Sequence, residues 1–151
     1  MTLRLSLLPL ASLLTLGSAL AQENPSPLTP LEKEFQDSMS GVTLAGRFAR
    51  QDGKLSEDKY VIEKATKIKD DLWRFDARIQ FGGQDVKIPV SLHVKWAGDT
   101  AVLTLTDEAV AGMGKFTVRI VIYRGQYAGT WSGGGPGHGG PMFGSIVKTA
   151  P

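Results

Sequence analysis

Residues 73–81 read WRFDARIQF, and this stretch decides the fold because its side chains alternate between apolar and polar. Alternation with a period of two is typical of a β-strand that turns one face to a core and the other to water. Trp73 and Phe75 begin the apolar face. Arg74 and Arg78 lie on the opposite face, where charged side chains are expected to be solvated and paired across strands. The alternative, in which these arginines face inward and hold an acidic ligand, conflicts with the bulky apolar face.

The same alternation recurs along the chain after Gly41. The connections between the alternating segments are mostly short, and short connections make neighbouring strands antiparallel. Pro89 cannot donate a hydrogen bond to a sheet, so we expect it at an edge, a bulge or a strand start. In the second strand we place Tyr60 and Ile62 on one face and Ala65 on the other. We expect eight strands, at residues 42–48, 58–68, 73–81, 86–97, 101–105, 114–123, 127–132 and 143–148, with a longer connection at 106–113.

A short helix is expected before the first strand, at about residues 30–38. Thr29 is a typical N-cap, Pro30 suits the first helical position, and Glu32 stands three residues after the cap. We expect the helix to pack on a sheet or across the mouth of a barrel. Its apolar stripe, at positions i, i+4 and i+8, consists of Leu31, Phe35 and Met39.

These elements predict an all-β fold. No helical pattern separates the strands, so parallel βαβ units are not expected. Eight consecutive antiparallel strands can cover their apolar faces by closing into an up-and-down barrel, which also removes both exposed edges. A β-sandwich is the alternative.

The beginning of the chain resembles an export signal. Arg4 precedes an apolar run, and residues 19–21 read ALA, a typical cleavage site. We therefore expect a signal peptide at residues 1–21, a flexible lead-in at 22–28 and a single barrel domain at 29–151, exported to the periplasm or the exterior. An uncleaved anchor is the alternative, and no stable membrane insertion is expected after cleavage.

Composition excludes several classes of site. The chain has no Cys, which excludes disulfides, thiol nucleophiles and thiolate metal sites. Positive and negative charges are nearly balanced and not clustered, which disfavours nucleic-acid binding. The two histidines, His93 and His138, lack a metal-ligand spacing, and neither a G-x-S-x-G nor an H-E-x-x-H motif occurs. We therefore predict no catalytic residue, no metal and no cofactor.

The inward face of the expected barrel is rich in aromatic rings. These rings either fill the barrel or form the walls of a pocket for a small apolar ligand, and an interior volume of about 300 Å³ or more would favour the pocket. We expect any pocket to lie beside the glycine-rich segment 133–140, which is either a mobile lid or a plain hairpin connection. The inward rings expected are Phe48, Trp73, Phe75, Phe81, Trp96, Phe116 and Trp131. The candidate ligand-binding residues are Trp73, Phe75, Trp96, Phe116, Trp131 and His138.

Residues 127–131 read YAGTW, and their Gly-Thr-Trp resembles a strand motif of avidin-type barrels and the G-x-W of lipocalins. The resemblance implies a calycin-type eight-stranded barrel. Those families carry the motif in their first strand, so no ligand-contacting residue is transferred to this chain. The overall pattern also resembles small exported bacterial proteins without an assigned activity.

Three functions are compatible with this sequence. The first is a non-enzymatic carrier that binds a small, largely apolar molecule in the barrel mouth. The second is a structural or interaction module of the cell envelope, with a filled barrel and an envelope protein as its partner. The third is a barrel enzyme of the allene-oxide-cyclase or dirigent type, which would require a pocket with at least two convergent ionisable side chains.

Overall fold

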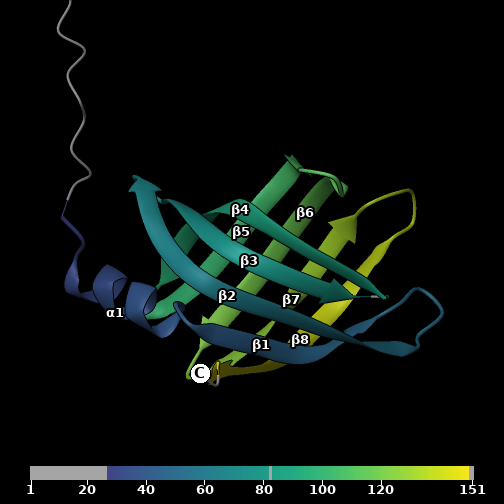
Figure 1. Ribbon diagram of the computed structural model, residues 1–151, viewed down its shortest axis with the longest axis horizontal. Coiled ribbons are helices and arrows are strands. Elements are labelled where there is room, and N and C mark those ends of the chain that lie inside the picture. The colour runs from purple at the N-terminus through teal and green to yellow at the C-terminus, as the bar shows by residue number, and fades with distance from the viewer. Residues whose placement is uncertain (1–26, 82, 150–151) are drawn as a thin grey trace, which may run out of the picture.

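The computed structural model describes residues 27–81 and 83–149 and shows a closed barrel of eight antiparallel strands (Figure 1). Each strand pairs with its neighbours in sequence, and the first pairs with the last, which confirms the up-and-down barrel and excludes the sandwich. The expected signal peptide and most of the lead-in lie outside the described residues. The elements are α1 (Pro30–Ser38), β1 (Val42–Ala49), β2 (Leu55–Lys69), β3 (Leu72–Phe81), β4 (Gln84–Ala97), β5 (Thr100–Val110), β6 (Gly114–Tyr123), β7 (Gln126–Gly133) and β8 (Gly139–Lys148).

The helix begins where the capping pattern predicts. The Glu32 amide donates to Oγ1 of Thr29 at 3.3 Å, and the Thr29 amide donates to Oε2 of Glu32 at 2.9 Å, which completes a capping box. Oε1 of Glu32 also accepts a hydrogen bond from Nζ of Lys67 on β2 at 2.6 Å. Both side chains are about 15 % exposed or less, so this ion pair anchors the start of α1 to the barrel.

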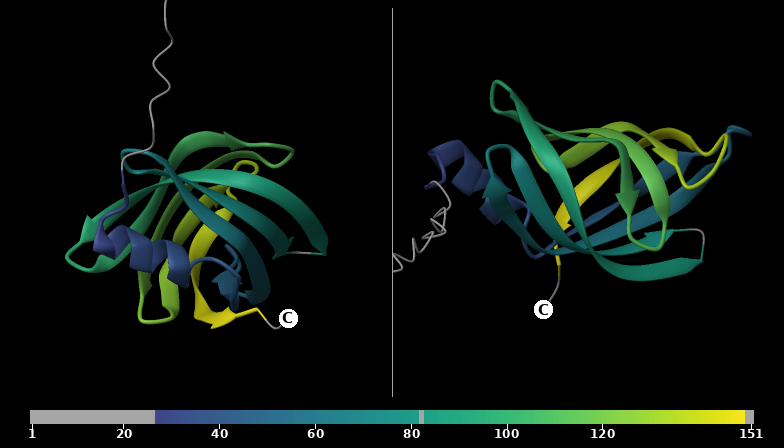
Figure 2. Two further views of the ribbon diagram at one scale, coloured as in Figure 1. Left: turned by 60° about the vertical axis from the view of Figure 1, so that its left-hand side comes forward. Right: turned by 90° about the horizontal axis from the view of Figure 1, so that it is seen from above.

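The helix closes one end of the barrel, as Figures 1 and 2 show. Its Phe35 is 5 % exposed, and Met39, directly after the helix, is 1 % exposed. This arrangement confirms that the apolar stripe packs across a barrel mouth.

Two register shifts move residues away from their expected positions. The first lies between Ile62 and Lys64 of β2, and it returns Ala65, which is fully buried, to the inner face. The prediction that Ala65 faces away from Ile62 is therefore wrong, because a bulge resets the alternation. The second lies between Leu105 and Glu108 of β5. Beyond it the strand continues to Val110, so the long connection expected at residues 106–113 is mostly strand.

Strands β4 and β5 are paired along only part of their length. Their ladder runs from His93, opposite Thr104, to Ala97, opposite Thr100. Residues 84–92 of β4 pair with β3 alone. Pro89 lies in this half-paired part, opposite Asp76 on β3, in agreement with the expected edge position.

The glycine-rich segment is more regular than expected. Strand β7 extends to Gly133 and β8 begins at Gly139, so the irregular loop is confined to residues 134–138, and the prediction of a loop over 133–140 is wrong at both ends. Glycine permits this pairing because a Cβ on Gly139 would lie 2.6 Å from the Trp131 carbonyl oxygen. The turn is closed by the Gly133 amide, which donates to the His138 carbonyl at 3.1 Å.

Candidate functional site

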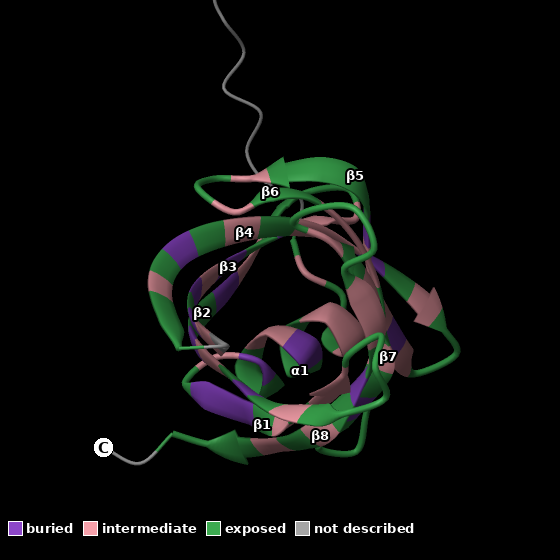
Figure 3. Cartoon of the chain, turned by 90° about the vertical axis from the view of Figure 1, so that its right-hand side faces the viewer, coloured by how far each residue is buried: buried purple, intermediate pink, exposed green. Residues whose placement is uncertain are grey.

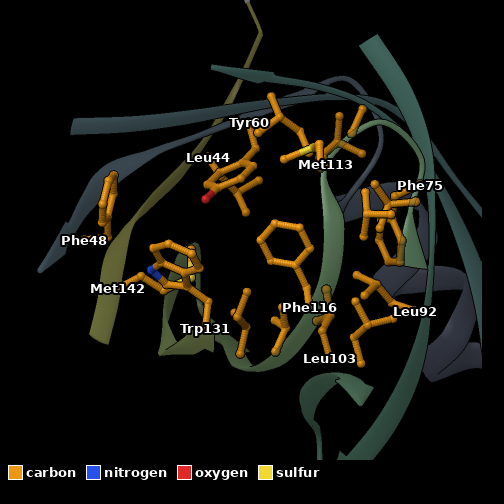
Figure 4. A pocket seen from close by; sticks show the side chains of 18 of the residues that line it. Leu44, Phe48, Tyr60, Phe75, Leu92, Leu103, Met113, Phe116, Trp131 and Met142 are labelled. Carbon is orange, nitrogen blue, oxygen red and sulfur yellow. The ribbon is translucent and has the colours of Figure 1, made fainter. Parts of the chain in front are cut away.

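An apolar cavity of about 170 Å³ lies inside the barrel. Every strand contributes a side chain to its wall, and Met39 closes it on the side of the helix. Figure 4 shows these side chains converging on a common space, with Leu44 and Tyr60 on one side and Phe116 and Leu103 on the other.

Aromatic rings pack together at the end of the barrel next to α1. Phe35 packs edge-on against Trp73 at 5.1 Å between centroids and against Trp96 at 5.5 Å. The ring of Phe75 lies 6.3 Å from the ring of Phe35, between centroids. Edge-to-face pairs of this kind contribute about 0.5–1.5 kcal/mol each beyond the burial of their area. This aromatic cluster, Phe35 with Trp73, Phe75 and Trp96, seals the cavity at the helix end.

The opposite end is not sealed. Figure 3 looks into this end, with α1 visible across the far side. Phe48, Phe116 and Trp131 face inward here and are nevertheless only partly buried. Trp131 contacts both other rings, at 5.6 Å and 6.3 Å between centroids. The half-paired part of β4 lies at the same end and contributes Val90 to the cavity wall. The cavity is therefore a cup that is open at this end. We call Phe48, Phe116 and Trp131 its aromatic rim.

The structure divides the predicted ligand-binding residues into three groups. Phe75, Phe116 and Trp131 line the cavity. Trp73 and Trp96 belong to the aromatic cluster at the helix end and do not line it. His138 is exposed in the 134–138 loop and does not line it either. The expected inward ring Phe48 does line the cavity, whereas the side chain of Phe81 lies outside the described part of the structure.

The charged rows of β3 and β4 face the solvent. Arg74 donates to Asp76 at 2.8 Å, and Nε of Arg78 donates to Asp85 at 2.7 Å. Both arginine side chains are about half exposed. The inward arrangement of these arginines, with an acidic ligand between them, is therefore excluded.

A buried carboxylate lies beside the cavity. Asp58 on β2 is 4 % exposed. The Tyr60 hydroxyl donates to Oδ2 of Asp58 at 3.1 Å, and the Tyr127 hydroxyl donates to Oδ1 at 3.1 Å. We call Asp58, Tyr60 and Tyr127 the buried triad, although Tyr60 itself is only partly buried; of the three, Tyr60 alone lines the cavity.

Glycines make room for the triad. Strand pairing places Tyr127, Gly144, Gly46 and Asp58 in one row across β7, β8, β1 and β2. A Cβ on Gly144 would lie 2.6 Å from Cε1 of the Tyr127 ring, and a Cβ on Gly46 would collide with its hydroxyl oxygen. The missing side chains let the Tyr127 ring cross two strands and reach Asp58.

Burial sets the protonation of the triad. It raises the pKa of Asp58 above its ordinary value, against the opposing effect of the hydrogen bonds from Tyr127 and Tyr60. Burial, together with the neighbouring carboxylate, also raises the pKa of Tyr60 and of Tyr127 far above the ordinary value of a phenol. Both hydroxyls therefore remain protonated at neutral pH, and each donates a hydrogen bond to Asp58.

The sequence alone did not single out Asp58 or Tyr127. The available signal was the alternation in β2, which places Asp58 on the same face as Tyr60 and Ile62. A carboxylate on an apolar face is rare unless it is paired.

Other features of the described residues suggest no second chemistry. No group of three or more His, Asp or Glu side chains there could hold a metal ion. A second hollow, of about 340 Å³, lies between α1 and the barrel end and is lined by Leu31, Trp96 and Arg124 among others. No helix in the described ranges is long and apolar enough to span a bilayer.

The chain was compared with protein-family models, with curated proteins and with solved structures, and none of the three comparisons gives a match.

Proposed function

We propose that this chain is an exported, non-enzymatic barrel that binds a small apolar molecule in the cup between Met39 and the aromatic rim. The observation that carries the proposal is the partial exposure of apolar side chains that face inward at one end only. Phe48, Phe116 and Trp131 would be fully buried in a solid barrel of this size. Their remaining exposed apolar area is what a ligand would cover.

The cavity volume limits the size of the ligand. An apolar cavity of about 150 Å³ is enough to bind benzene, and the volume here is about 170 Å³. This volume is below the value of about 300 Å³ that was expected to favour a pocket. Pockets for drug-sized ligands measure about 300–1,000 Å³, so a ligand of that size would not fit whole. The proposed ligand is therefore a single ring or a short chain, or the apolar end of a longer molecule that extends past the rim.

Two alternatives are less well supported. A filled interaction module does not account for the half-exposed rim. The barrel enzyme would find convergent ionisable groups in the buried triad. General acid–base catalysis works best with a pKa near the working pH, however, and the raised pKa of Tyr60 moves it away from that range. The pKa of Asp58 is raised toward that range, but Asp58 does not line the cavity.

The closed barrel with one covered end is compatible with a calycin-type fold. We propose this relationship as an extension of the Gly-Thr-Trp resemblance at residues 129–131. The leader pattern at residues 1–21 supports export.

The proposal is tested by titrating the purified protein with toluene and following backbone amide signals by NMR. Saturable binding at about 0.1–1 mM is expected for a ligand of seven heavy atoms, with shifts confined to residues that face the cavity. Native mass spectrometry of the same preparation would reveal a ligand that co-purifies. Absence of saturable shifts together with a single bare mass would contradict the proposal.

Strand β6 offers a matched pair of variants. Val118 lines the cavity, whereas Val121 is 42 % exposed on the outer face. Val118→Phe should fill the cup and weaken toluene binding at least about tenfold. Val121→Phe makes the same chemical change outside the barrel and should leave binding unchanged.

A further inference from the structure

The polar groups that line the cavity indicate what kind of apolar molecule it prefers. Among the described side chains that line it, only Tyr60 carries an oxygen and only Trp131 carries a nitrogen. The Trp131 indole lies at the half-exposed rim, where water can reach it. Tyr60 belongs to β2 and is tied to the buried triad, so it is the polar group that a ligand inside the cup would meet.

The hydrogen-bond direction at Tyr60 is fixed. A tyrosine hydroxyl has one proton and otherwise only accepts. The proton of Tyr60 is donated to Oδ2 of Asp58, whose other oxygen accepts from Tyr127. The oxygen of Tyr60 can therefore accept a hydrogen bond from a ligand in the cavity, but it cannot donate one.

The negative charge of the Asp58 carboxylate adds to this preference for a ligand that donates a hydrogen bond. Asp58 is 4 % exposed, and its two side-chain hydrogen-bond partners, Tyr60 and Tyr127, carry no positive charge. A charge with little solvent around it acts over longer distances than one in water. The field in the adjoining cavity favours the positive end of a dipole and opposes a second negative charge.

We infer that the cup selects compact apolar molecules that carry a hydroxyl donor, such as a phenol or a short alcohol, and excludes carboxylates of the same size. The inference rests on the proposed function and adds the class of ligand to it. The hydroxyl would donate to Oη of Tyr60 while the apolar remainder packs against the cavity wall. A carboxylate would bring a second negative charge next to Asp58 with no donor to receive it there.

Three para-substituted methylbenzenes test the inference: toluene, p-cresol and p-toluate, whose para position carries a hydrogen, a hydroxyl or a carboxylate. Each is titrated into the protein at pH 7 and followed by NMR. We expect p-cresol to bind about 3- to 10-fold more tightly than toluene, the factor that one neutral hydrogen bond provides. We expect p-toluate to bind at least about tenfold more weakly than toluene. If no acceptor were available, p-cresol would bind no more tightly than toluene, because its hydroxyl would lose water without compensation.

Two tyrosine variants locate the effect. Tyr60→Phe should abolish the preference for p-cresol and leave toluene affinity within about twofold. Tyr123→Phe makes the same change at a side chain on the outer face, 42 % exposed, and should keep the preference. Should Tyr60→Phe fail to fold, Asp58→Asn removes the charge at constant shape and should raise the affinity for p-toluate.

The outcomes separate the two proposals. Binding of toluene with no preference for p-cresol, or a preference that survives Tyr60→Phe, would overturn the inference and leave the proposed function standing. Binding of none of the three ligands would overturn the proposed function and the inference together.

Discussion

The hydroxyl of Tyr127 lies 3.1 Å from Oδ1 of Asp58, although the two residues stand on strands that are separated by two others. The contact exists because the intervening positions, Gly144 and Gly46, carry no side chains. Four positions on four neighbouring strands, Tyr127, Gly144, Gly46 and Asp58, are thus needed for the hydrogen bond between Tyr127 and Asp58. A buried carboxylate costs several kcal/mol unless hydrogen bonds compensate for it, which gives this row its structural purpose.

Gly46→Ala should destabilise the fold by about 2–3 kcal/mol. The added Cβ would collide with the Phe143 carbonyl and the Tyr127 hydroxyl, and the backbone contact cannot move without opening the barrel wall. Urea denaturation measures the free energy of unfolding. The control is Ala45→Val on the exposed face of the same strand, which should change it by no more than about 0.5 kcal/mol. Equal effects of the two substitutions would show that the Tyr127 ring does not depend on the missing side chain.

Asp58 should give the protein an unusual response to acid. Its pKa is raised in the folded chain above the ordinary 3.8, so the folded chain holds this proton more tightly than the unfolded chain does. The contribution of Asp58 to the free energy of unfolding therefore rises as the pH falls from the raised pKa toward 3.8, and it is lost as the pH rises through that window.

Asp58→Asn provides the comparison for this response because it cannot titrate. Urea denaturation of both proteins over a series of pH values isolates the one carboxylate, since all other groups cancel in the difference. The free energy of unfolding of the wild type, minus that of Asp58→Asn, should increase on acidification. A difference that decreases on acidification would mean that the pKa of Asp58 is lowered in the fold.

The alternation at residues 73–81, repeated along the chain with short connections, predicted an all-β fold of eight antiparallel strands, but it left the β-sandwich open as the alternative to the barrel. The capping pattern at Thr29 predicted the start of α1, since that signal is local and complete within four residues. What local pattern did not reveal was register. The bulge after Ile62 reverses the alternation of β2, and nothing near it in the sequence marks the change.

The candidate site was predicted only in part, and the reason is again physical. All the predicted aromatic rings satisfy the same rule of inward alternation, and the rule does not distinguish an end filled by Phe35 from an open end. Trp73 was therefore included in the predicted ligand-binding site, although the structure places it in the aromatic cluster at the helix end. The row from Tyr127 to Asp58 depends on pairing between distant strands, which composition and periodicity do not encode.

Phe35→Ala should show how much the helix contributes to the closed end. Phe35 is 5 % exposed and packs against three aromatic rings, so its removal leaves a cavity that the rigid barrel cannot collapse. We expect a loss of about 3–5 kcal/mol in the free energy of unfolding and a reduced near-ultraviolet circular dichroism signal from Trp73 and Trp96. Glu34→Ala, on the exposed side of the same helix, is the control and should have little effect. A small loss for Phe35→Ala would indicate that the barrel is stable without its helix.

The two tyrosines of the buried triad should resist ionisation until the barrel unfolds. Burial and the Asp58 carboxylate raise the pKa of Tyr60 and Tyr127, so their stabilising effect is complete below the ordinary pKa of 10.0 and is lost as the pH rises above it. Tyr123→Phe removes the third tyrosine of the chain, so that absorbance of phenolate at 295 nm then reports on the triad alone. In this variant the absorbance should rise only together with the loss of the β-sheet circular dichroism signal. In a second variant, with Tyr60→Phe added, the rise should be half as large. A phenolate signal that titrates near pH 10 with the sheet signal intact would mean that neither hydroxyl is committed to Asp58.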